Sequence, residues 1–191
     1  ALLYRYSGQE DIIVGTMIAN RDSVEFERLI GLFLNALPLR TDLSGDPTFR
    51  ELLARVRDVT LGAYAHQDLP FEMLVDESQP ERRADQTPLF RAFFDLQTAP
   101  RSAINLPGLT LSPIVLEDST IKFDLRMSLA EDGQRLVGSI DYEAGLFDET
   151  AMKKAPAHFR TLLGSVVENP DQPLSSLRLL DDAESDGQSP S

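Results

Sequence analysis

Several residue types that build common functional sites are absent or rare in this chain of 191 residues. The sequence has no cysteine, which excludes disulfide frameworks, zinc ribbons, iron–sulfur clusters and cysteine nucleophiles. It has only two histidines, His66 and His158, so a catalytic metal site is not expected. Because nothing indicates a disulfide-built secreted protein, the sequence favours a cytoplasmic location.

Basic residues are also scarce, with 18 lysines and arginines against 31 aspartates and glutamates, a net charge of −13. Such a surface repels phosphate backbones and anionic lipids, so neither nucleic acid nor a membrane is an expected partner. No apolar run approaches the ~20 residues that span a bilayer. No signal peptide is expected, because charged residues interrupt the N-terminal region. The start at Ala1 suggests a segment of a longer polypeptide.

Three glycine motifs that mark common enzyme classes are missing as well. The sequence contains no Gly-Lys-Ser phosphate loop and no Gly-x-Gly-x-x-Gly turn, so nucleotide binding of either kind is not expected. It contains no Gly-x-Ser-x-Gly elbow, which leaves a serine hydrolase unsupported. Any function must therefore come from other patterns.

The sequence does have the composition of a globular protein, with 42% hydrophobic and 26% charged residues. Its length predicts one domain with a substantial core. Apolar runs predict strands at 12–19, 33–40, 91–97, 109–115, 121–129 and 135–142. Helical spacing predicts helices that end at Gly8, cover 24–30 and 46–66, and follow Asp148. This order favours the α/β class, as a two-layer sandwich with a mixed or antiparallel sheet and packed helices.

Caps and turns give these elements their expected limits. Asp46 is the expected N-cap of the long helix, with Pro47 at its first position, and Pro70 prevents the helix from continuing beyond about His66. The Asp132-Gly133 pair predicts a hairpin between the last two strands. Pro156 predicts a kink in the final helix, or a helix that starts only at Ala155. The acidic tail 181–191 is expected to be a disordered linker.

His66 allows two interpretations. Asp68 lies two residues further on, so His66 could be a general base with an orienting carboxylate. Alternatively, an imidazolium at the C-terminus of a helix suits the helix dipole, and the residue would then only complete the helix. The residues alone favour this second, structural role.

Three segments resemble the C-terminal motifs of nonribosomal peptide synthetase condensation domains. Residues 30–40 (IGLFLNALPLR) resemble (I/V)GxFVNT(L/Q)xxR, and residues 66–72 (HQDLPFE) resemble (H/N)QDxPFE. Residues 82–89 (RRADQTPL) keep Arg82, Pro88 and Leu89 of the third pattern, RDxSRNPL. The resemblance extends over residues 1–180. The family's catalytic HHxxxDG signature does not occur in this sequence.

This resemblance implies a chloramphenicol-acetyltransferase-like lobe, the C-terminal one of the two that form a condensation domain. The complete domain would join an acyl and an aminoacyl thioester as an amide. Both substrates would be carried on 4'-phosphopantetheine arms of the upstream and downstream peptidyl carrier proteins. The other implied partners are the N-terminal lobe and, through the linker, an adenylation domain. This lobe would bind no cofactor directly, and without the HHxxxDG signature it is expected to be inactive alone.

The resemblance also assigns roles to particular residues. Asn35, on a predicted central strand, could line a polar substrate tunnel or could instead satisfy local backbone groups. Gly15 and Thr16 follow a central strand, and Gly15 would allow a thiol arm to approach closely. The structural motif residues are Arg40, His66, Gln67, Asp68, Pro70, Phe71, Glu72 and Arg82.

Two other functions remain open at this stage. An epimerization domain of the same superfamily would reset a stereocentre, but it varies at both of the well-matched motifs. A catalytically silent lobe that only docks carrier proteins would have the same fold. An intact HHxxxDG in the preceding ~230 residues would favour catalysis, and its absence would favour docking.

Overall fold

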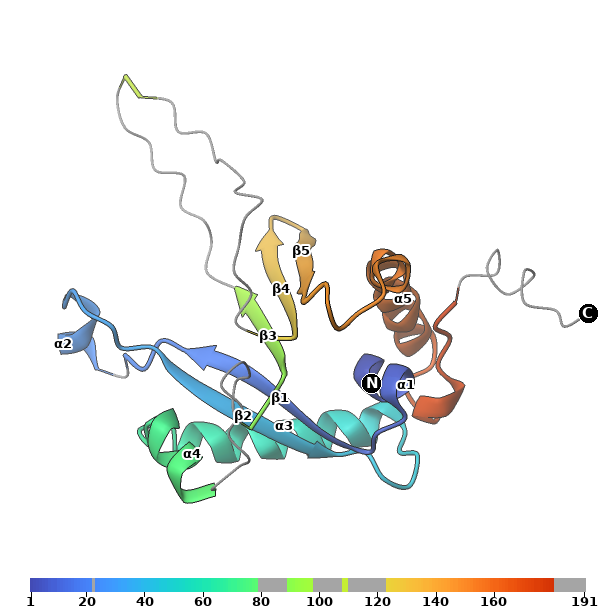
Figure 1. The fold of residues 1–191 in the computed structure, drawn as a ribbon, viewed down its shortest axis with the longest axis horizontal. Coiled ribbons are helices and arrows are strands. Elements are labelled where there is room, and N and C mark those ends of the chain that lie inside the picture. Colours follow the sequence, from blue (N-terminus) through green and yellow to red (C-terminus); the bar gives the residue numbers. More distant parts are fainter. Residues whose placement is uncertain (22, 79–88, 98–107, 110–122, 181–191) are drawn as a thin grey trace, which may run out of the picture.

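The computed structural model describes residues 1–21, 23–78, 89–97, 108–109 and 123–180. Its strands form one five-stranded sheet in the order β2-β1-β3-β4-β5 (Figure 1). The strands are β1 (Asp11–Ile18), β2 (Asn35–Asp42), β3 (Ala92–Gln97), β4 (Leu125–Asp132) and β5 (Arg135–Tyr142). The helices are α1 (Leu2–Ser7), α2 (Val24–Glu27), α3 (Phe49–Ala65), α4 (Phe71–Ser78), α5 (Glu149–Glu168) and the short 3-10 helix η1 (Leu174–Ser176).

The sheet is mixed, which is one of the two arrangements, mixed or antiparallel, that the sequence predicts. β1 pairs with β2 in the antiparallel direction, from Asp11 opposite Asp42 to Ile18 opposite Asn35. β3 runs parallel to both β1 and β4, and β4 and β5 form an antiparallel hairpin. The predicted hairpin is confirmed, and its turn starts at Gly133, whose φ of 64° suits a residue without a Cβ.

Helices α3 and α5 pack with η1 to form the main core. The most buried residues of this core are Leu43, Leu52, Leu162, Val166, Leu174 and Leu177. Arg5 of α1 holds η1 in place, because its guanidinium donates to the carbonyls of Leu174 at 3.2 Å and Ser175 at 2.8 Å. The C-terminal end of the described chain is thereby joined to its first helix.

The N-terminus of α3 differs from the sequence prediction. Thr48, not Asp46, is the N-cap: its hydroxyl accepts from the Glu51 N–H, and the Glu51 carboxylate accepts from the Thr48 N–H. This reciprocal capping box satisfies two helix-end donors and fixes the start at Phe49. Asp46 instead has a positive φ of 47°, and its carboxylate accepts from the Ser175 N–H at 2.9 Å.

Arg55 lies four residues after Glu51, a spacing that predicts an ion pair on the surface of α3. Its guanidinium instead donates to the backbone carbonyls of Asp42 at 2.8 Å and Ser44 at 3.2 Å. Those carbonyls belong to the end of β2 and the loop after it. Arg55 therefore joins the helix to the sheet, which a helical-spacing argument alone does not predict.

Other element limits shift by a few residues. α2 ends at Glu27 instead of residue 30, and β4 starts at Leu125. The polar stretch 76–88, with its two prolines, predicts a surface loop, but α4 continues to Ser78. α5 starts directly after its Asp148 cap and continues through Pro156, so the alternative start at Ala155 is wrong. The buried face of α5 includes His158 and Ser165. Helical spacing places Val167 on the apolar face of this helix, but Val167 is exposed.

Some predicted features lie outside the described residues. These are the strand at 109–115 except for Leu109, the residues of the loop beyond Ser78, Arg82 and the acidic tail 181–191. Among the helices that the structure describes, none is both long enough and apolar enough to cross a membrane.

Candidate functional site

Asn35 joins the first motif segment to the second. Its Nδ2 donates to the carbonyls of Gln67 at 2.8 Å and Leu69 at 2.9 Å. Its Oδ1 accepts from the backbone N–H of Phe71 and from that of Ala36, each at 3.1 Å. Both donors of the amide and both lone pairs of its oxygen are thus engaged with backbone groups. This geometry favours the local-backbone role of Asn35 over the tunnel-lining role.

Residues 66–71, which we call the motif loop, run from the C-cap of α3 to the first residue of α4. His66 is the C-cap residue of α3, as the sequence predicts, and its N–H donates to the Ala63 carbonyl at 3.1 Å. The carbonyl of Pro70 accepts from two N–H groups in the first turn of α4. The side chains of His66 and Asp68 are exposed. Asn35 therefore binds the loop where the backbone leaves one helix and enters the next.

Gly15 lies beneath an aromatic ring. A Cβ at this position would lie 2.1 Å from the nearest carbon of the Phe90 ring, far inside van der Waals contact. The Phe90 ring packs in turn on Phe71 of α4, with centroids 5.5 Å apart, and on Phe123, at 5.7 Å. Phe90 therefore fills the space next to Gly15 in which the sequence analysis expects a thiol arm. The absence of a side chain at Gly15 lets the Phe90 ring pack directly on β1.

The remaining predicted residues lie on the same two strands or around the motif loop. Thr16 is half-buried on β1, opposite Leu37 of β2. Arg40 is exposed on β2 and forms a two-pronged ion pair with Asp11, with Nε–Oδ1 and Nη2–Oδ2 distances of 2.9 and 2.7 Å. This hydrogen bonding lowers the pKa of the Asp11 carboxyl. Glu72 is exposed in the first turn of α4.

The structure thus brings two of the predicted groups together. Asn35, Gln67 and Phe71 are in direct contact, and Gly15 reaches Phe71 through Phe90. Arg40 lies apart, toward the opposite end of β2, and Arg82 is outside the described residues. Phe90 carries no motif signal that would select it from the sequence.

Sequence reasoning also missed Arg21. This residue follows β1, and its guanidinium contacts three backbone carbonyls between Phe26 and Gly31. The position of Arg21, directly after a strand and within a polar turn, follows no sequence pattern that would mark it as a functional or structural residue. Its contacts arise only because the chain from Ser23 to Phe33 folds back over it.

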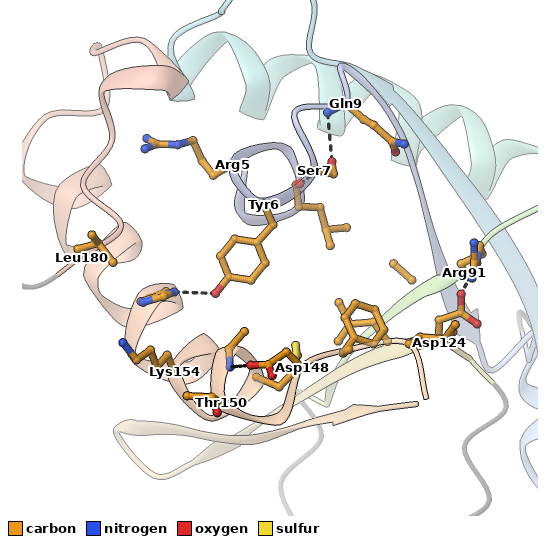
Figure 2. Close-up of a pocket in the computed structure, with 18 residues that line it drawn as sticks. Arg5, Tyr6, Ser7, Gln9, Arg91, Asp124, Asp148, Thr150, Lys154 and Leu180 are labelled. Atoms are coloured by element: carbon orange, nitrogen blue, oxygen red, sulfur yellow. Dashed lines mark hydrogen bonds and ion pairs between the residues drawn. The ribbon is translucent and has the colours of Figure 1, made fainter. Parts of the chain in front are cut away.

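A separate cavity of about 940 Å³ lies between α1, α5 and the starts of β3 and β4 (Figure 2). None of the predicted site residues that the structure describes lines it. Its apolar lining comes chiefly from Leu3, Leu125, Leu146, Phe147 and Met152.

Polar groups stand at two ends of this cavity. Figure 2 shows Tyr6 extending from α1 toward α5, where its hydroxyl shares a 2.8 Å hydrogen bond with Nδ1 of His158. His158 is buried, whereas its place on the last helix predicts a surface or half-buried packing residue. At the other end Arg91 and Asp124 form an ion pair. These contacts join α1 to α5, and they join the residue before β3 to the residue before β4, so they are structural links.

The contacts around the motif loop are of a kind that fixes the positions of structural elements, and they do not assemble a catalytic group. It consists of amide hydrogen bonds to backbone and of packed aromatic rings, which fix the positions of two helices on a sheet. Among the residues that the structure describes, no group of three His, Asp or Glu side chains converges as a metal site. The motif loop is therefore a structural element that joins β2 to α3 and α4.

Comparison with known proteins gives a consistent result. A family model described as "Condensation domain" matches residues 1–188. A linear gramicidin synthase polypeptide from Brevibacillus parabrevis is 48% identical over 185 residues, which is 96% of this chain. The match spans only 2% of that relative's length.

Solved structures show the same similarity. The complex of the X-domain and OxyB from teicoplanin biosynthesis contains a chain matched with a TM-score of 0.84 and 30% identity, over 95% of this chain and 40% of that one. A four-domain nonribosomal peptide synthetase, AB3403, matches over 96% of this chain and 15% of that one. Its TM-score is 0.81 at 20% identity, so this likeness concerns the fold alone.

Proposed function

Because the chain belongs to the condensation domain family of nonribosomal peptide synthetases, we propose that residues 1–180 form the C-terminal lobe of such a domain. The main support is the family match over residues 1–188 together with the coverage of 40% of the solved X-domain chain, about the share of one lobe of two. The occurrence of the C-terminal motifs without HHxxxDG agrees with this assignment. Residues 181–191 would then be an acidic linker to an adenylation domain.

The complete domain would form an amide bond between two carrier-bound substrates. The amine of the downstream aminoacyl thioester attacks the carbonyl carbon of the upstream acyl thioester. A C–N bond forms, the C–S bond breaks, and the amine loses a proton while the departing pantetheine thiolate gains one. The second histidine of HHxxxDG in the N-terminal lobe would deprotonate or position the attacking amine. The phosphopantetheine arms belong to the substrates on their carriers, in a cytoplasmic synthetase.

This lobe would contribute positioning to the reaction. The motif loop is held to β2 by Asn35 and to the aromatic cluster by Phe71, so it can serve as a fixed wall of the substrate tunnel. Holding two large substrates in a reactive geometry lowers the barrier substantially, even when the holding group exchanges no proton. Thr16 is the proposed wall residue, with Gly15 and Phe90 packed nearby, and Asn35 supports the motif loop from β2.

The test is a condensation assay on the intact domain that contains this chain. Upstream and downstream carrier proteins are loaded with acyl and aminoacyl thioesters, and the amide product is measured by mass spectrometry. We expect product from the intact domain and none above the uncatalysed rate from residues 1–191 alone, after circular dichroism has shown that this fragment is folded. Turnover by the folded fragment, or none by the intact domain, would contradict the proposal.

A docking lobe without catalysis is the second candidate. One observation favours it: the chain is 30% identical to an X-domain that was solved in complex with another protein, OxyB. If this function is correct, the intact domain retains a partner protein on an affinity column but yields no amide in the condensation assay. The sequence before Ala1 gives an independent check, because a docking lobe does not need an intact HHxxxDG.

A further inference from the structure

An incomplete ion pair lies between the neighbouring strands β3 and β4. Nη2 of Arg126 donates to Oδ2 of Asp95 at 2.9 Å, and the Ser128 hydroxyl donates to the same oxygen at 3.3 Å. Oδ1 of Asp95 and Nε of Arg126 are buried, and neither has a hydrogen-bond partner among the residues that the structure describes. One acceptor and one donor of the Asp95–Arg126 pair are therefore unused. Such groups are uncommon in folded proteins, because each keeps the full cost of its removal from water.

The Asp95–Arg126 pair lies on the face of the sheet opposite α5. Leu125 lines the cavity between α1 and α5. Successive side chains of a strand point to opposite faces, so Arg126 points away from that cavity, and Asp95 binds it on the same face. The Arg126 side chain is 41% exposed and that of Asp95 is 17% exposed. The pair is therefore recessed but can be reached from outside through the end of the arginine.

A row of aromatic rings connects the motif loop to this pair. Phe71, at the end of the motif loop, packs on Phe90 with a centroid distance of 5.5 Å, and Phe90 lies 6.4 Å from Phe93 of β3. The central guanidinium carbon of Arg126 lies 5.8 Å from the centroid of the Phe93 ring. In the proposed function the motif loop is a wall of the substrate tunnel. The rings continue that wall as far as the Asp95–Arg126 pair.

We propose that the Asp95–Arg126 pair is a subsite for a neutral carboxamide side chain, as in glutamine or asparagine, on a carrier-bound substrate. This inference rests on the proposed function. A carboxamide has a carbonyl oxygen that can accept from Nε of Arg126 and an N–H that can donate to Oδ1 of Asp95. It thus supplies both missing partners at once. The exposed end of the Arg126 side chain moves aside to admit it.

The opposite charges of the pair disfavour other ligand classes. A substrate carboxylate would lie against Asp95 and an ammonium group against Arg126, and either would weaken the existing ion pair. An apolar side chain would leave the two unused polar atoms without partners. Sites built to form hydrogen bonds reject analogues that lack the matching group. A peptide backbone with substituents on both sides fits a recessed pair less well than the end of one side chain does.

Binding of loaded carrier proteins to the intact domain that contains this chain tests the proposal. The upstream or the downstream carrier is given a hydrolysis-stable, amide-linked pantetheine analogue that bears glutamine, glutamate or norleucine. Calorimetry measures the dissociation constant of each form. We expect the glutamine form to bind roughly tenfold more tightly than the other two in one of the two arms. The arm that shows this preference identifies the substrate as donor or acceptor, and equal binding in both arms would overturn the proposal.

A double variant removes the pair without leaving a buried charge. Asp95→Leu/Arg126→Met replaces both charged side chains with apolar ones, whereas either single truncation would leave its partner unpaired. We expect the double variant to lose the preference for glutamine and to bind the norleucine form as the parent domain does. The matched control, Arg50→Met/Asp171→Leu, removes an exposed ion pair that joins α3 to the segment before η1, and it should keep the preference.

Three other outcomes would also overturn the proposal: a preference for glutamate, a glutamine preference that survives in the double variant, and equally weakened binding of all three forms to that variant. If the double variant does not fold, Asp95→Asn provides the second test. It removes the negative charge beside Arg126, so the preference should change from glutamine to glutamate. Because binding is measured, a domain that prefers glutamine but forms no amide would count against the proposed reaction alone.

Discussion

The side chain of Asn35 explains why two separate sequence motifs occur together, because it binds one motif to the backbone of the other. From the sequence it is a polar residue on a strand, equally suited to a tunnel or to local backbone. In the structure its amide contacts Gln67, Leu69, Phe71 and Ala36, which are all backbone partners. The two well-matched motifs are therefore one structural unit, and their spacing in the sequence reflects this contact.

Replacing Asn35 with Ala should lower the stability of the domain by about 1–3 kcal/mol, because several hydrogen bonds to a half-buried backbone are lost together. Asn35→Asp should be at least as destabilising, since it places a carboxylate oxygen against the Gln67 and Leu69 carbonyls. Urea unfolding of both variants measures this. If Asn35→Ala keeps its stability but loses condensation rate, the residue belongs to the tunnel and not to the support.

Gly15 is the second residue whose role depends on a contact distant in sequence. Gly15→Ala should destabilise the domain by about 1–3 kcal/mol, because the new methyl group overlaps the Phe90 ring and forces it to move. Gly62→Ala is the control: it lies within α3 with nothing within 4 Å of the added carbon, so it should stabilise by roughly 0.5–1 kcal/mol. Thermal unfolding of the two variants should shift in opposite directions, and a shift in the same direction would contradict this account.

At the scale of elements, the sequence at the start of α3 offers two possible N-cap residues, and only one of them can cap the helix. Asp46-Pro47 and Thr48 with Glu51 are both ordinary helix starts in the sequence. The structure selects Thr48, because the Asp46 carboxylate is engaged with Ser175, a residue distant in sequence. A capping rule that considers only neighbouring residues cannot predict that Ser175, from the C-terminal segment, binds the Asp46 carboxylate.

Thr48→Ala should therefore cost about 0.5–2 kcal/mol, as for other lost N-caps, whereas Thr48→Ser should retain most of the stability. Chemical denaturation gives both values. The protection of the first α3 amides against hydrogen exchange should fall in Thr48→Ala only. A larger loss of that protection in Asp46→Ala than in Thr48→Ala would restore Asp46 as the cap.

At the scale of the whole molecule, acidic residues link stability to pH. Hydrogen bonds lower the pKa of several carboxyl groups below their ordinary values of 3.8 for Asp and 4.5 for Glu: Arg40 acts on Asp11, Ser175 on Asp46 and the Thr48 backbone on Glu51. With folded pKa values below the unfolded ones, the unfolded chain binds more protons in acid. Their contribution to stability is present above the ordinary values and is lost as pH falls through the folded ones.

We therefore expect the melting temperature to stay level from pH 7 to about pH 5 and to fall progressively below about pH 4. Asp46→Asn keeps an oxygen that can accept from Ser175 but cannot titrate, so its melting temperature should fall less steeply in acid. Calorimetry between pH 7 and pH 3 measures both curves. A melting temperature that rises on acidification would contradict the conclusion that folding lowers the pKa values of these carboxyl groups.

The sequence by itself determined the α/β class, the hairpin at Gly133, the end of α3 at His66 and the Asp148 cap, because each depends on local periodicity or on a neighbouring residue. It left the sheet as either mixed or antiparallel. The motif strings also determined the family. Only the tertiary structure decided that Asn35 binds the motif loop, that Phe90 fills the space over Gly15 and that Arg21 binds the carbonyls of Phe26, Leu29 and Gly31. Those contacts join groups that chain folding brings together in space, and no spacing rule within a single element encodes them.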